Sequence, residues 1–534
     1  MSLSRRECLS LLLGAPLGLA ACERPRPKPV PGRVVGASMN LGHRVRNLGD
    51  IPSTAKVRQV PVVIVGSGIA GLSAAWRLLR KGQTEFTVLE LESRAGGTSA
   101  YGTDGVVPYP WAAHYLPLPS EQHESLCTLL SEMGVVERDR NGVLVGREQD
   151  LVRDPEERLF IRNEWVEGVI PSPVFTAADR AEWQHFEAIV GRWIAFRDTH
   201  GRRAFTLPLA HCSDATEVTS LDRLSAHEWL NQNGFRSQPL RWFLEYGCRD
   251  DYGTNLRTTS AWALLFYHVS RISQVGGESA PFLTWPAGNG RIVQFLERVV
   301  GHRLERNKMA LDVQPHADGV RIAVFGAADG QFEILEAKRV ILAVPQFIVK
   351  HLVRPFRANM PEHCAAFTYS PWMVANLHLK SRPKSRGVPL AWDNVIYGGA
   401  SLGYVVATHQ TLEDDGETIW TYYQPFVDDN PELARYRLAA ADQSSAWDAI
   451  AAELSPAHTG FTSSVGRADV WHWGHAMVRP VPGFIWGAAR QRAAAPYGPI
   501  HFAHTDLSGV PLLDEAQFHG VRAADEVLER LFVE

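Results

Sequence analysis

The sequence predicts an α/β protein in which a parallel sheet flanked by helices is interrupted by an inserted α+β domain. Three observations predict this arrangement. A strand, a glycine-rich turn and an amphipathic helix follow one another near residue 60, the pattern becomes helical from about residue 151, and buried-strand patterns return from about residue 284 and near the C-terminus. The chain has 534 residues, which is long enough for two or three domains.

The glycine-rich turn has the spacing G-x-G-x-x-G and is formed by Gly66, Gly68 and Gly71. It follows an apolar run, Pro61 to Val65, that predicts a buried parallel strand, and it leads into an amphipathic helix from Ile69 to Lys81. The first glycine permits the tight turn, the second lets backbone approach a pyrophosphate, and the third allows close packing of helix on strand. The helix N-terminus adds free N–H groups and partial positive charge for the phosphates.

A second strand, Thr87 to Leu91, carries Glu90 near its end, 24 residues after the first glycine and so near the typical spacing of about 20. An acid at this spacing typically holds a ribose hydroxyl. Because strand, glycines, helix, strand and acid occur together and in order, we predict that this segment binds a dinucleotide.

The residues that follow carry a family resemblance. Glu90, Arg94, Gly96 and Gly97 form E-x-x-x-R-x-G-G, which resembles the FAD-dependent amine oxidase superfamily, a group that includes polyamine oxidases, phytoene desaturases and protoporphyrinogen oxidases. The resemblance implies a Rossmann-like FAD-binding domain of the amine oxidase type, with the Arg-Gly-Gly turn along the pyrophosphate and ribityl chain of FAD. Thr98 replaces an arginine that is usual at the next position.

Two later blocks extend the resemblance. The strand at residues 339–345 resembles one that closes the FAD-binding sheet, and the backbone near Ala310 is expected to contact the adenine. Asp506 matches an acid that binds a ribityl hydroxyl, although His504 replaces a usual glycine. Glu515 lies in the closing helix, whose N-terminus faces the flavin in relatives. The cysteine that binds flavin covalently in some members has no counterpart here, so we expect non-covalent FAD.

The resemblance divides the chain into alternating parts. We expect an export signal and proline-rich tether at 1–31, FAD-binding parts at 60–150, 284–346 and 465–534, and substrate-domain parts at 151–283 and 347–464.

Candidate substrate-side residues come from several places in the chain. His114 and Trp473 are the candidate catalytic residues, because relatives bring these stretches beside the flavin ring. For His114, a structural role as a hydrogen-bonded histidine is an equally good interpretation. Asp250 and Asp251 lie in a polar stretch, 248–253, that we expect between helices. They are candidates to hold a cationic substrate, with a helix cap or a salt bridge to Arg249 as the structural alternative. The remaining candidate for substrate contact is Trp486.

One departure concerns the strand from Trp372 to Leu379. In amine oxidases the matching strand often carries a lysine bridged by water to flavin N5, and here that position is Val374. This argues against the best-known amine oxidase arrangement or for a different route of flavin reoxidation.

The reaction that the resemblance implies is hydride transfer from an organic substrate, expected to be an amine, to flavin N5. The electrons then pass to oxygen or a quinone-like acceptor. An amine must be neutral to release hydride, and a water-poor aromatic pocket favours the neutral form. Two alternatives stay open: a desaturase or isomerase of an apolar, isoprenoid-like substrate, and a flavin-binding protein without turnover. A short pocket rimmed by acids would favour the amine, and a long apolar tunnel the isoprenoid.

The first residues predict export. Ser4 to Leu9 (SRRECL) resembles a twin-arginine signal followed by a short apolar stretch, and Leu19 to Cys22 (LAAC) resembles a lipobox whose cysteine would be acylated. A small-residue cleavage site with an incidental cysteine is the alternative. We therefore expect a periplasmic protein that contacts the membrane only through a lipid at Cys22.

Composition excludes some partners and sites. The net charge of −4 gives no electrostatic reason to bind nucleic acid. None of the six cysteines has metal-binding or C-x-x-C spacing, so no metal site is expected. A disulfide within the set Cys127, Cys212, Cys248 and Cys364 is left open.

Overall fold

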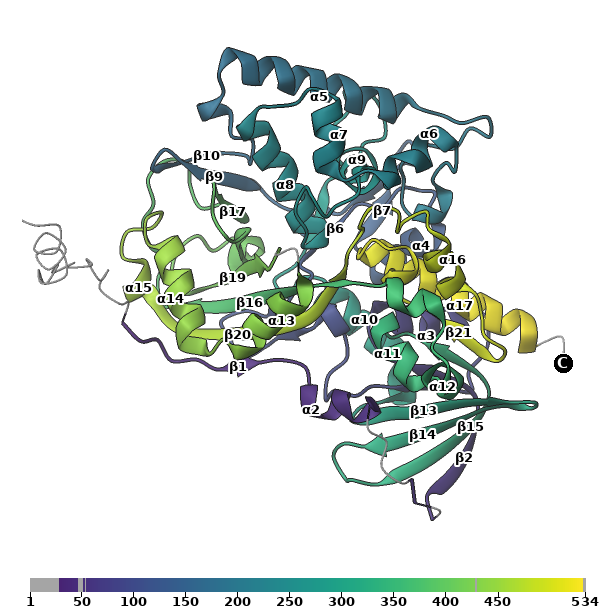
Figure 1. Cartoon of the computed structure of the whole chain (residues 1–534). Coiled ribbons are helices and arrows are strands. Elements are labelled where there is room, and N and C mark those ends of the chain that lie inside the picture. The colour runs from purple at the N-terminus through teal and green to yellow at the C-terminus, as the bar shows by residue number, and fades with distance from the viewer. Residues whose placement is uncertain (1–27, 47–50, 53, 428–429, 532–534) are drawn as a thin grey trace, which may run out of the picture.

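The computed structural model describes residues 28–46, 51–52, 54–427 and 430–531, and it builds them into two lobes around two large sheets (Figure 1). The twin-arginine motif and Cys22 lie outside the described residues. The lower lobe in Figure 1 contains the glycine-rich turn, and the upper lobe contains a long mixed sheet with a group of helices beside it. The fold is the mixed α/β class that the sequence predicts.

The sheet of the lower lobe has seven strands in the order β12-β3-β2-β15-β14-β13, with β21 beside β15. The strands β2, β3, β12 and β21 run parallel to their neighbours, whereas β13, β14 and β15 form an antiparallel meander. Their bounds are β2 (Lys56–Val65), β3 (Phe86–Leu89), β12 (Leu304–Glu305), β13 (Lys308–His316), β14 (Gly319–Gly326), β15 (Phe332–Leu342) and β21 (Ile500–Phe502).

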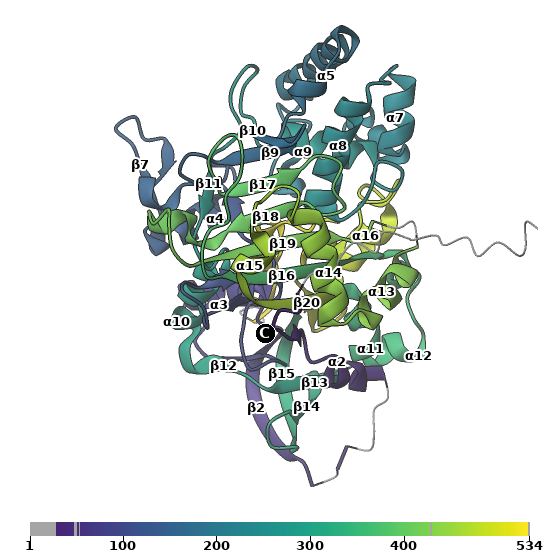
Figure 2. The same cartoon turned by 90° about the vertical axis from the view of Figure 1, so that its left-hand side faces the viewer.

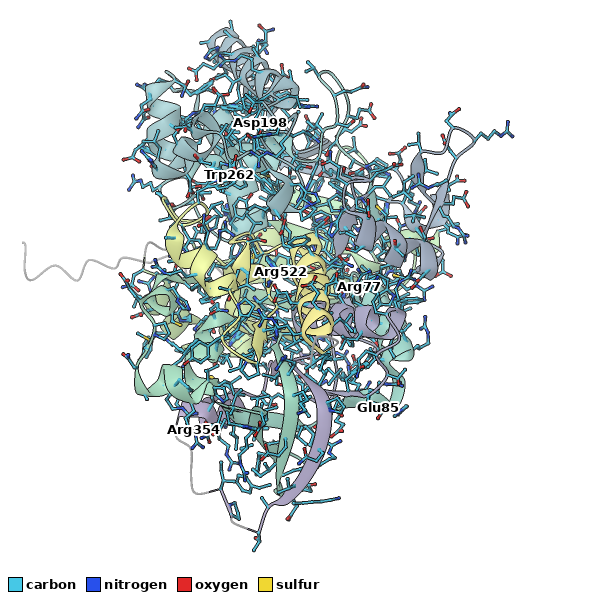
Figure 3. All side chains as sticks on the ribbon, turned by 90° about the vertical axis from the view of Figure 1, so that its right-hand side faces the viewer. Arg77, Glu85, Asp198, Trp262, Arg354 and Arg522 are labelled. Carbon is cyan, nitrogen blue, oxygen red and sulfur yellow. The ribbon has the colours of Figure 1, made fainter. Side chains whose placement is uncertain are left out.

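Two helices cover this sheet beside the glycine-rich turn: α3 (Ile69–Arg80) and α17 (Leu513–Leu531). They touch closely at Gly520, where an added Cβ would lie 2.2 Å from the carbonyl oxygen of Ala70. Further along, Arg77 on α3 pairs with Asp525 on α17 at 2.7 Å, and Figure 3 shows Arg77 and Arg522 on these neighbouring helices. The expected helices 69–81 and 512–531 are thus present to within a residue at each end.

The sheet of the upper lobe has eight strands in the order β1-β20-β16-β19-β18-β17-β9-β10. Figure 2 shows these strands stacked from β10 at the top to β20 below. Their bounds are β1 (Val34–Val35), β9 (Glu157–Ile161), β10 (Glu164–Glu167), β16 (Tyr369–Leu379), β17 (Asp393–Ile396), β18 (Gly403–Val406), β19 (Thr418–Pro425) and β20 (Val465–Val478). The helices α13 (Pro431–Ala440), α14 (Gln443–Leu454) and α15 (Phe461–Ser464) accompany it.

The helices of the inserted part lie at the top of the molecule in Figure 1: α5 (Ala177–Ala195), α6 (Thr216–Thr219), α7 (Ala226–Gln232), α8 (Gln238–Tyr252) and α9 (Ala261–Val269). Reciprocal capping boxes start α5 at Thr176 and α7 at Ser225, and both satisfy free N–H groups of the first turn. Residues 248–252, which we expected between helices, are instead the last turn of α8. The helix stops only at Gly253, which has a positive φ of 61°.

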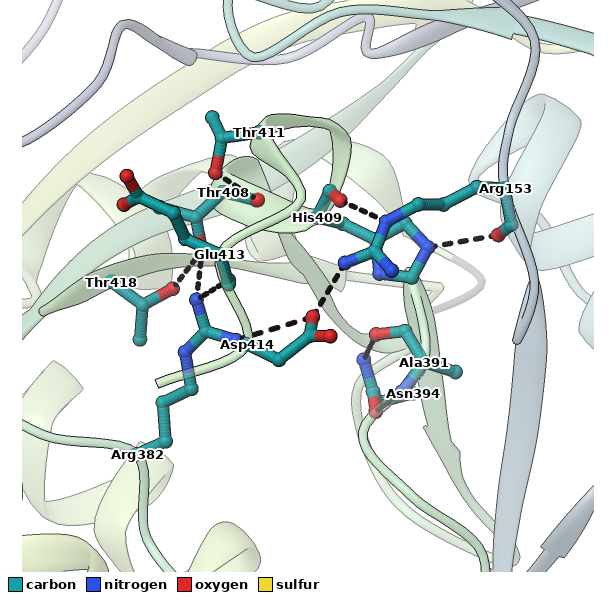
Figure 4. A network of polar contacts seen from close by, with 10 residues as sticks. All are labelled: Arg153, Arg382, Ala391, Asn394, Thr408, His409, Thr411, Glu413, Asp414 and Thr418. Atoms are coloured by element: carbon teal, nitrogen blue, oxygen red, sulfur yellow. Dashed lines mark hydrogen bonds and ion pairs between the residues drawn. The ribbon is translucent and has the colours of Figure 1, made fainter. Parts of the chain in front are cut away.

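The remaining α-helices and β-strands of the described residues complete the fold. They are α2 (Met39–Gly42), β4 (Tyr101–Gly102), β5 (Tyr109–Pro110), β6 (Tyr115–Pro117), α4 (Glu124–Met133), β7 (Val136–Arg138), β8 (Leu144–Gly146), β11 (Phe282–Thr284), α10 (Gly290–Val300), α11 (Gln346–Leu352), α12 (Arg354–Ala358) and α16 (Ala488–Ala494). Figure 4 shows one junction, where Arg153 at the entry to the upper sheet hydrogen-bonds the His409 carbonyl and contacts Asp414. Arg382 contacts Asp414 from the other side, at 3.8 Å.

The described end of the proline-rich segment packs on the upper sheet. The Trp447 indole donates to the Lys28 carbonyl at 3.0 Å, and Val30 is buried among the residues of α14 and β20. Val34 and Val35 then pair with β20 as a parallel edge strand. This part of the expected tether is therefore docked on the protein.

Three further findings concern the described residues alone. None of their helices is both long and apolar enough to cross a membrane. Nowhere among them do three His, Cys, Asp or Glu side chains meet in a way that would hold a metal ion. The four cysteines left open by the sequence are buried free thiols, so the structure contains no disulfide between them.

Candidate functional site

The turn between β2 and α3 forms a backbone cradle. Gly66 has a φ of +99°, and an added Cβ on Gly71 would lie 1.9 Å from the carbonyl oxygen of Gly66. A Cβ on Gly68 would meet no protein atom within 4 Å, so the backbone at this residue faces open space. Gly68 is also the N-cap of α3 and offers no side-chain hydrogen bond to the first turn. The free N–H groups and the open space fit the pyrophosphate of FAD.

A second glycine turn lies against this cradle. Gly96 bridges to Gly68, and a Cβ on Gly97 would lie 3.4 Å from the Gly68 Cα. Both glycines have positive φ angles, 122° and 56°. Thr98 follows at the edge of the large cavity, whereas Arg94 is exposed and approaches only the Tyr101 carbonyl, at 3.4 Å. The sequence block E-x-x-x-R-x-G-G thus lies beside the first glycine turn.

Glu90 lies directly after β3 and is buried beside the cradle. One carboxylate oxygen accepts hydrogen bonds from the Ser67 N–H at 3.0 Å and the Ser67 hydroxyl at 2.5 Å, and the other accepts from the Glu92 N–H at 2.8 Å. Burial raises its pKa, against the lowering effect of these hydrogen bonds. This position fits the acid that holds a ribose hydroxyl.

Two further residues predicted to contact FAD, Ala310 and Asp506, are both buried. Ala310 is buried in β13 at a β-bulge. Asp506 is buried after β21 and accepts hydrogen bonds from the Gln346 N–H at 2.7 Å and the Tyr369 hydroxyl at 2.5 Å. Although burial opposes its ionisation, the neighbouring His504 and these hydrogen bonds lower its pKa.

Glu515 lies in the first turn of α17 and is fully buried, but its carboxylate is already engaged. One oxygen accepts from the Leu209 N–H at 2.6 Å, and the other accepts from the Ser508 hydroxyl. The preceding residue, Asp514, lines the cavity instead.

A single large cavity extends from Thr98 and the start of α17 to α8 and the upper sheet. It encloses about 1030 Å³ of space free of protein atoms, part of it open to solvent. Backbone and side chains of 112–117, the strands β16, β19 and β20, and the residues just before α17 form most of its wall. Its aromatic members include Tyr115, Tyr246, Trp372, Tyr423 and Trp473.

Acidic side chains gather at the end of this cavity that lies beside α8. Asp250 and Asp393 line it, and each is within 3.4 Å of a tyrosine hydroxyl, that of Tyr115 and that of Tyr246 respectively. Asp393 on β17 is the direct partner of Glu157 on the parallel strand β9. Burial raises the pKa of Asp250 and of Glu157 to about 7, and neighbouring acids add to the effect. Burial and the same acids raise the pKa of Asp393 well above its ordinary range.

Asp251 differs from its neighbour because it has a cation of its own. Arg271 contacts both of its carboxylate oxygens, at 3.0 and 3.3 Å, and the two side chains are 3% and 8% exposed. The alternative of a salt bridge to Arg249 is wrong, since Arg249 donates to the carbonyls of Gly399 and Ser401. Among the described lining residues, the basic side chains are Arg271 and His114. Within the described part of the chain, neither Asp250 nor Asp393 forms an ion pair with a basic side chain of the cavity wall, although the charge of Arg271 lowers the pKa of Asp250 from nearby.

The structure brings the two candidate catalytic residues into the cavity wall. The His114 ring lies 4.7 Å from the Tyr423 ring, and burial lowers its pKa to about 4, so it is neutral at physiological pH. The Trp473 indole donates to the Trp111 carbonyl at 2.8 Å. Val374, which stands where relatives often have lysine, also lines the cavity.

Trp486 does not line the cavity. Its backbone N–H donates to Asp222, and its ring faces Trp262 in the core of the helical part. Sequence reasoning missed Asp393, Tyr246 and Tyr423, which lie in stretches without a motif, and it missed Asp514 because it chose the neighbouring Glu515 in the closing helix.

Comparisons with known proteins agree with this geometry. The model of the family described as flavin containing amine oxidoreductase matches residues 69–528. A Mycobacterium tuberculosis protein whose name assigns it to the flavin-containing monoamine oxidases is 24% identical over 504 residues, which is 88% of this chain and 96% of that protein. A D-amino acid dehydrogenase of Vibrio atlanticus is 36% identical over only 61 residues, 11% of this chain and 14% of that protein.

Two solved structures show the same fold. Putrescine oxidase bound to putrescine superposes with a TM-score of 0.65 at 17% identity, covering 89% of this chain and all of that one. Cyclohexylamine oxidase from Brevibacterium oxydans superposes with a TM-score of 0.64 at 15% identity and the same coverage.

Proposed function

The chain belongs to the flavin containing amine oxidoreductase family and is an FAD-dependent oxidoreductase, and we propose that its substrate is an organic amine oxidised at the C–H bond beside nitrogen. The observation that carries this proposal is the acidic end of the cavity, where Asp250 and Asp393 line the wall and neither forms an ion pair with a described basic side chain of that wall. Like charges held this close are costly unless a cation or a proton neutralises them. An ammonium group supplies that cation.

The glycine cradle holds the cofactor in this proposal. Backbone N–H groups at the start of α3 receive the pyrophosphate, and Glu90 receives a ribose hydroxyl. When bound, FAD supplies the hydride acceptor. The chain itself binds and orients the substrate and keeps water away from it.

The cavity wall has two distinct tasks. Asp250 and Asp393 hold the cationic part of the substrate, and the tyrosine and tryptophan rings exclude water around the rest. A dry surrounding lowers the pKa of an ammonium group and so favours the neutral amine that can release hydride. His114, neutral at physiological pH, can orient a substrate through a hydrogen bond, and it carries no charge that would repel an ammonium group.

The acids also separate this proposal from the alternatives. An apolar, isoprenoid-like substrate would leave the charges of Asp250 and Asp393 buried with only tyrosine hydroxyls as partners, which is unfavourable. A flavin-binding protein without turnover would have no need for a cavity of about 1030 Å³ that opens to solvent. Both remain as outcomes of the experiment below.

The test is anaerobic mixing of the FAD-loaded protein with single compounds. Diamines, monoamines of equal length and the corresponding alcohols are compared by loss of the flavin absorbance. We expect amines to bleach the flavin and alcohols to leave it unchanged. Bleaching by apolar polyenes alone would support the desaturase, and bleaching by nothing in the panel would contradict the amine proposal.

We also propose that the protein acts after export by the twin-arginine route and is held at a membrane by a lipid on Cys22. The motifs at residues 4–9 and 19–22 support this. With oxygen or a quinone-like compound as acceptor, a periplasmic location would place the enzyme near the respiratory membrane. Replacing Cys22 with alanine should move the protein from the membrane fraction to the soluble periplasmic fraction, and an unchanged distribution would contradict the anchor.

A further inference from the structure

Asp514 is a cavity acid that stands apart from the acidic group described above. It lies in the first turn of α17, lines the cavity, and is only 3% exposed. The nearest basic side chain that contacts it is His123, whose Nδ1 lies 4.0 Å from its Oδ1. Burial raises the pKa of Asp514 to about 6.

His123 forms a second layer behind Asp514 and is itself 2% exposed. Its Nε2 lies 3.0 Å from the side-chain oxygen of Gln517, which also accepts a hydrogen bond from the Ser125 hydroxyl. Because an amide oxygen only accepts, Nε2 carries the proton of the neutral ring. Nδ1 then presents a lone pair toward Asp514, and it is a buried atom without a hydrogen-bond partner.

Oxidation of an amine needs such a proton acceptor. A protonated amine must lose one proton from nitrogen before the C–H bond can give up hydride. Asp251 is neutralised by Arg271, and Asp250 and Asp393 already serve the cation. Asp514 is the remaining carboxyl group among the described lining residues.

We propose that Asp514 accepts the proton that the substrate's ammonium group must lose, and that the free Nδ1 of His123 holds the resulting carboxyl group in place by accepting its hydrogen bond. The ammonium N–H bond breaks, its electron pair stays on nitrogen, and an O–H bond forms on the Asp514 carboxylate. The neutral carboxyl then donates a hydrogen bond to the lone pair on His123 Nδ1 and keeps its proton. Charge is conserved at each step, and no further reactant is needed. The inference rests on the proposed amine substrate.

The groups around the pair set its pH behaviour. Arg271 lowers the pKa of Asp514 and Asp251 raises it, while burial has the largest effect. Burial lowers the pKa of His123 to about 4, with His211 nearby adding to the effect and Gln517 opposing it. Glu515 is the adjacent acid on the same helix and is held by Leu209 and Ser508. At pH 7 the resting pair is therefore a carboxylate facing a neutral imidazole, the state that can accept a proton.

The test compares Asp514→Asn with Asp525→Asn, a matched change on the same helix outside the cavity. In anaerobic rapid mixing with a substrate amine, Asp514→Asn should slow flavin reduction by about 100-fold or more and remove the rise of the rate around pH 6. Asp525→Asn should behave like the unaltered enzyme, and Asp514→Glu should restore part of the rate. Equal rates and pH profiles in Asp514→Asn and Asp525→Asn would overturn the proposal.

A second readout does not depend on turnover. tert-Butylamine has no C–H bond beside nitrogen, so it binds without being oxidised. Its addition to the FAD-loaded protein should produce an infrared band of a protonated carboxyl group. This band should be absent in Asp514→Asn and present in His123→Gln. The His123→Gln variant should show slower turnover only. Persistence of the band in Asp514→Asn would overturn the assignment of Asp514. Full turnover in His123→Gln would overturn the positioning role of His123. If no amine bleaches the flavin of the unaltered protein, the proposed function fails instead.

Discussion

Glu515→Gln tests what a buried acid at the start of α17 does. The sequence places this residue at the cofactor, whereas its carboxylate is engaged by the Leu209 N–H and the Ser508 hydroxyl. A glutamine has nearly the same shape, and its amide can still accept from Leu209 and donate to the Ser508 oxygen. The substitution therefore keeps both contacts and removes only the buried charge.

The size of the effect follows from the pKa of Glu515. Burial raises this pKa from 4.5 to about 7, with the adjacent Asp514 adding to the effect. Since the folded protein binds the proton more tightly than the unfolded chain, stability falls as pH rises from about 4.5 to about 7. Each unit of pKa corresponds to about 1.4 kcal/mol, so the loss above pH 7 is on the order of 3 kcal/mol. Glu515→Gln should escape this loss.

The assay is thermal unfolding of the FAD-loaded and FAD-free proteins between pH 4.5 and 8. The Tm of Glu515→Gln should match that of the unaltered protein near pH 4.5 and exceed it by about 3 to 6 °C at pH 8, with FAD content unchanged. Glu529→Gln, an exposed change on the same helix, is the control and should have no effect at either pH. A variant that loses FAD and gains no stability would refute this reasoning and support the cofactor role predicted from sequence.

Three other substitutions test the site. Gly68→Ala places its Cβ in open space, so the Tm of the FAD-free protein should not change. Its affinity for FAD, measured by flavin fluorescence, should fall at least 10-fold. An unchanged affinity would mean that no cofactor approaches this backbone. Arg271→Met leaves Asp251 buried without its cation and should reduce the free energy of unfolding, measured by denaturant titration, by about 3 to 5 kcal/mol. Adding Asp251→Asn to this variant should restore most of the lost stability. Asp250→Asn should raise the KM for amines about 10-fold and leave FAD content unchanged, and an unchanged KM would remove Asp250 from substrate recognition.

The cofactor half of the molecule could be predicted from the sequence because its determinants are local. The strand, glycines, helix and acid around residues 61–90 follow one another in the chain, and each has a backbone reason for its residue type. Gly71 illustrates this, since its missing Cβ is what lets α3 pack against the Gly66 carbonyl. The structure keeps these elements within a few residues of the predicted bounds.

The substrate half could be predicted only in part because its determinants meet through the topology. Asp250 was identified from an unusually polar stretch, although that stretch is the end of a helix rather than a link between helices. Asp393 belongs to a short strand with no motif, and its importance arises only when β17 pairs with β9 and sets it beside Glu157. Trp486 was predicted to contact substrate because it is an aromatic residue near a flavin-binding block. In the structure it packs against a hydrophobic core instead.

The pairing of Asp393 with Glu157 bears on why this cavity suits a cation. Like charges on directly opposed strand residues are destabilising, and here both lie next to Asp250 in a region with little solvent. In the empty cavity protons relieve the repulsion, as the raised pKa values of all three acids indicate. A bound ammonium group relieves it without protonation, so substrate binding and ionisation of these acids stabilise each other. Asp251 also raises the pKa of Asp250, but its own charge is compensated by the ion pair with Arg271. Of the four neighbouring acids, Asp251 is thus the one with an ion pair, and the proposed ammonium group would compensate the other three.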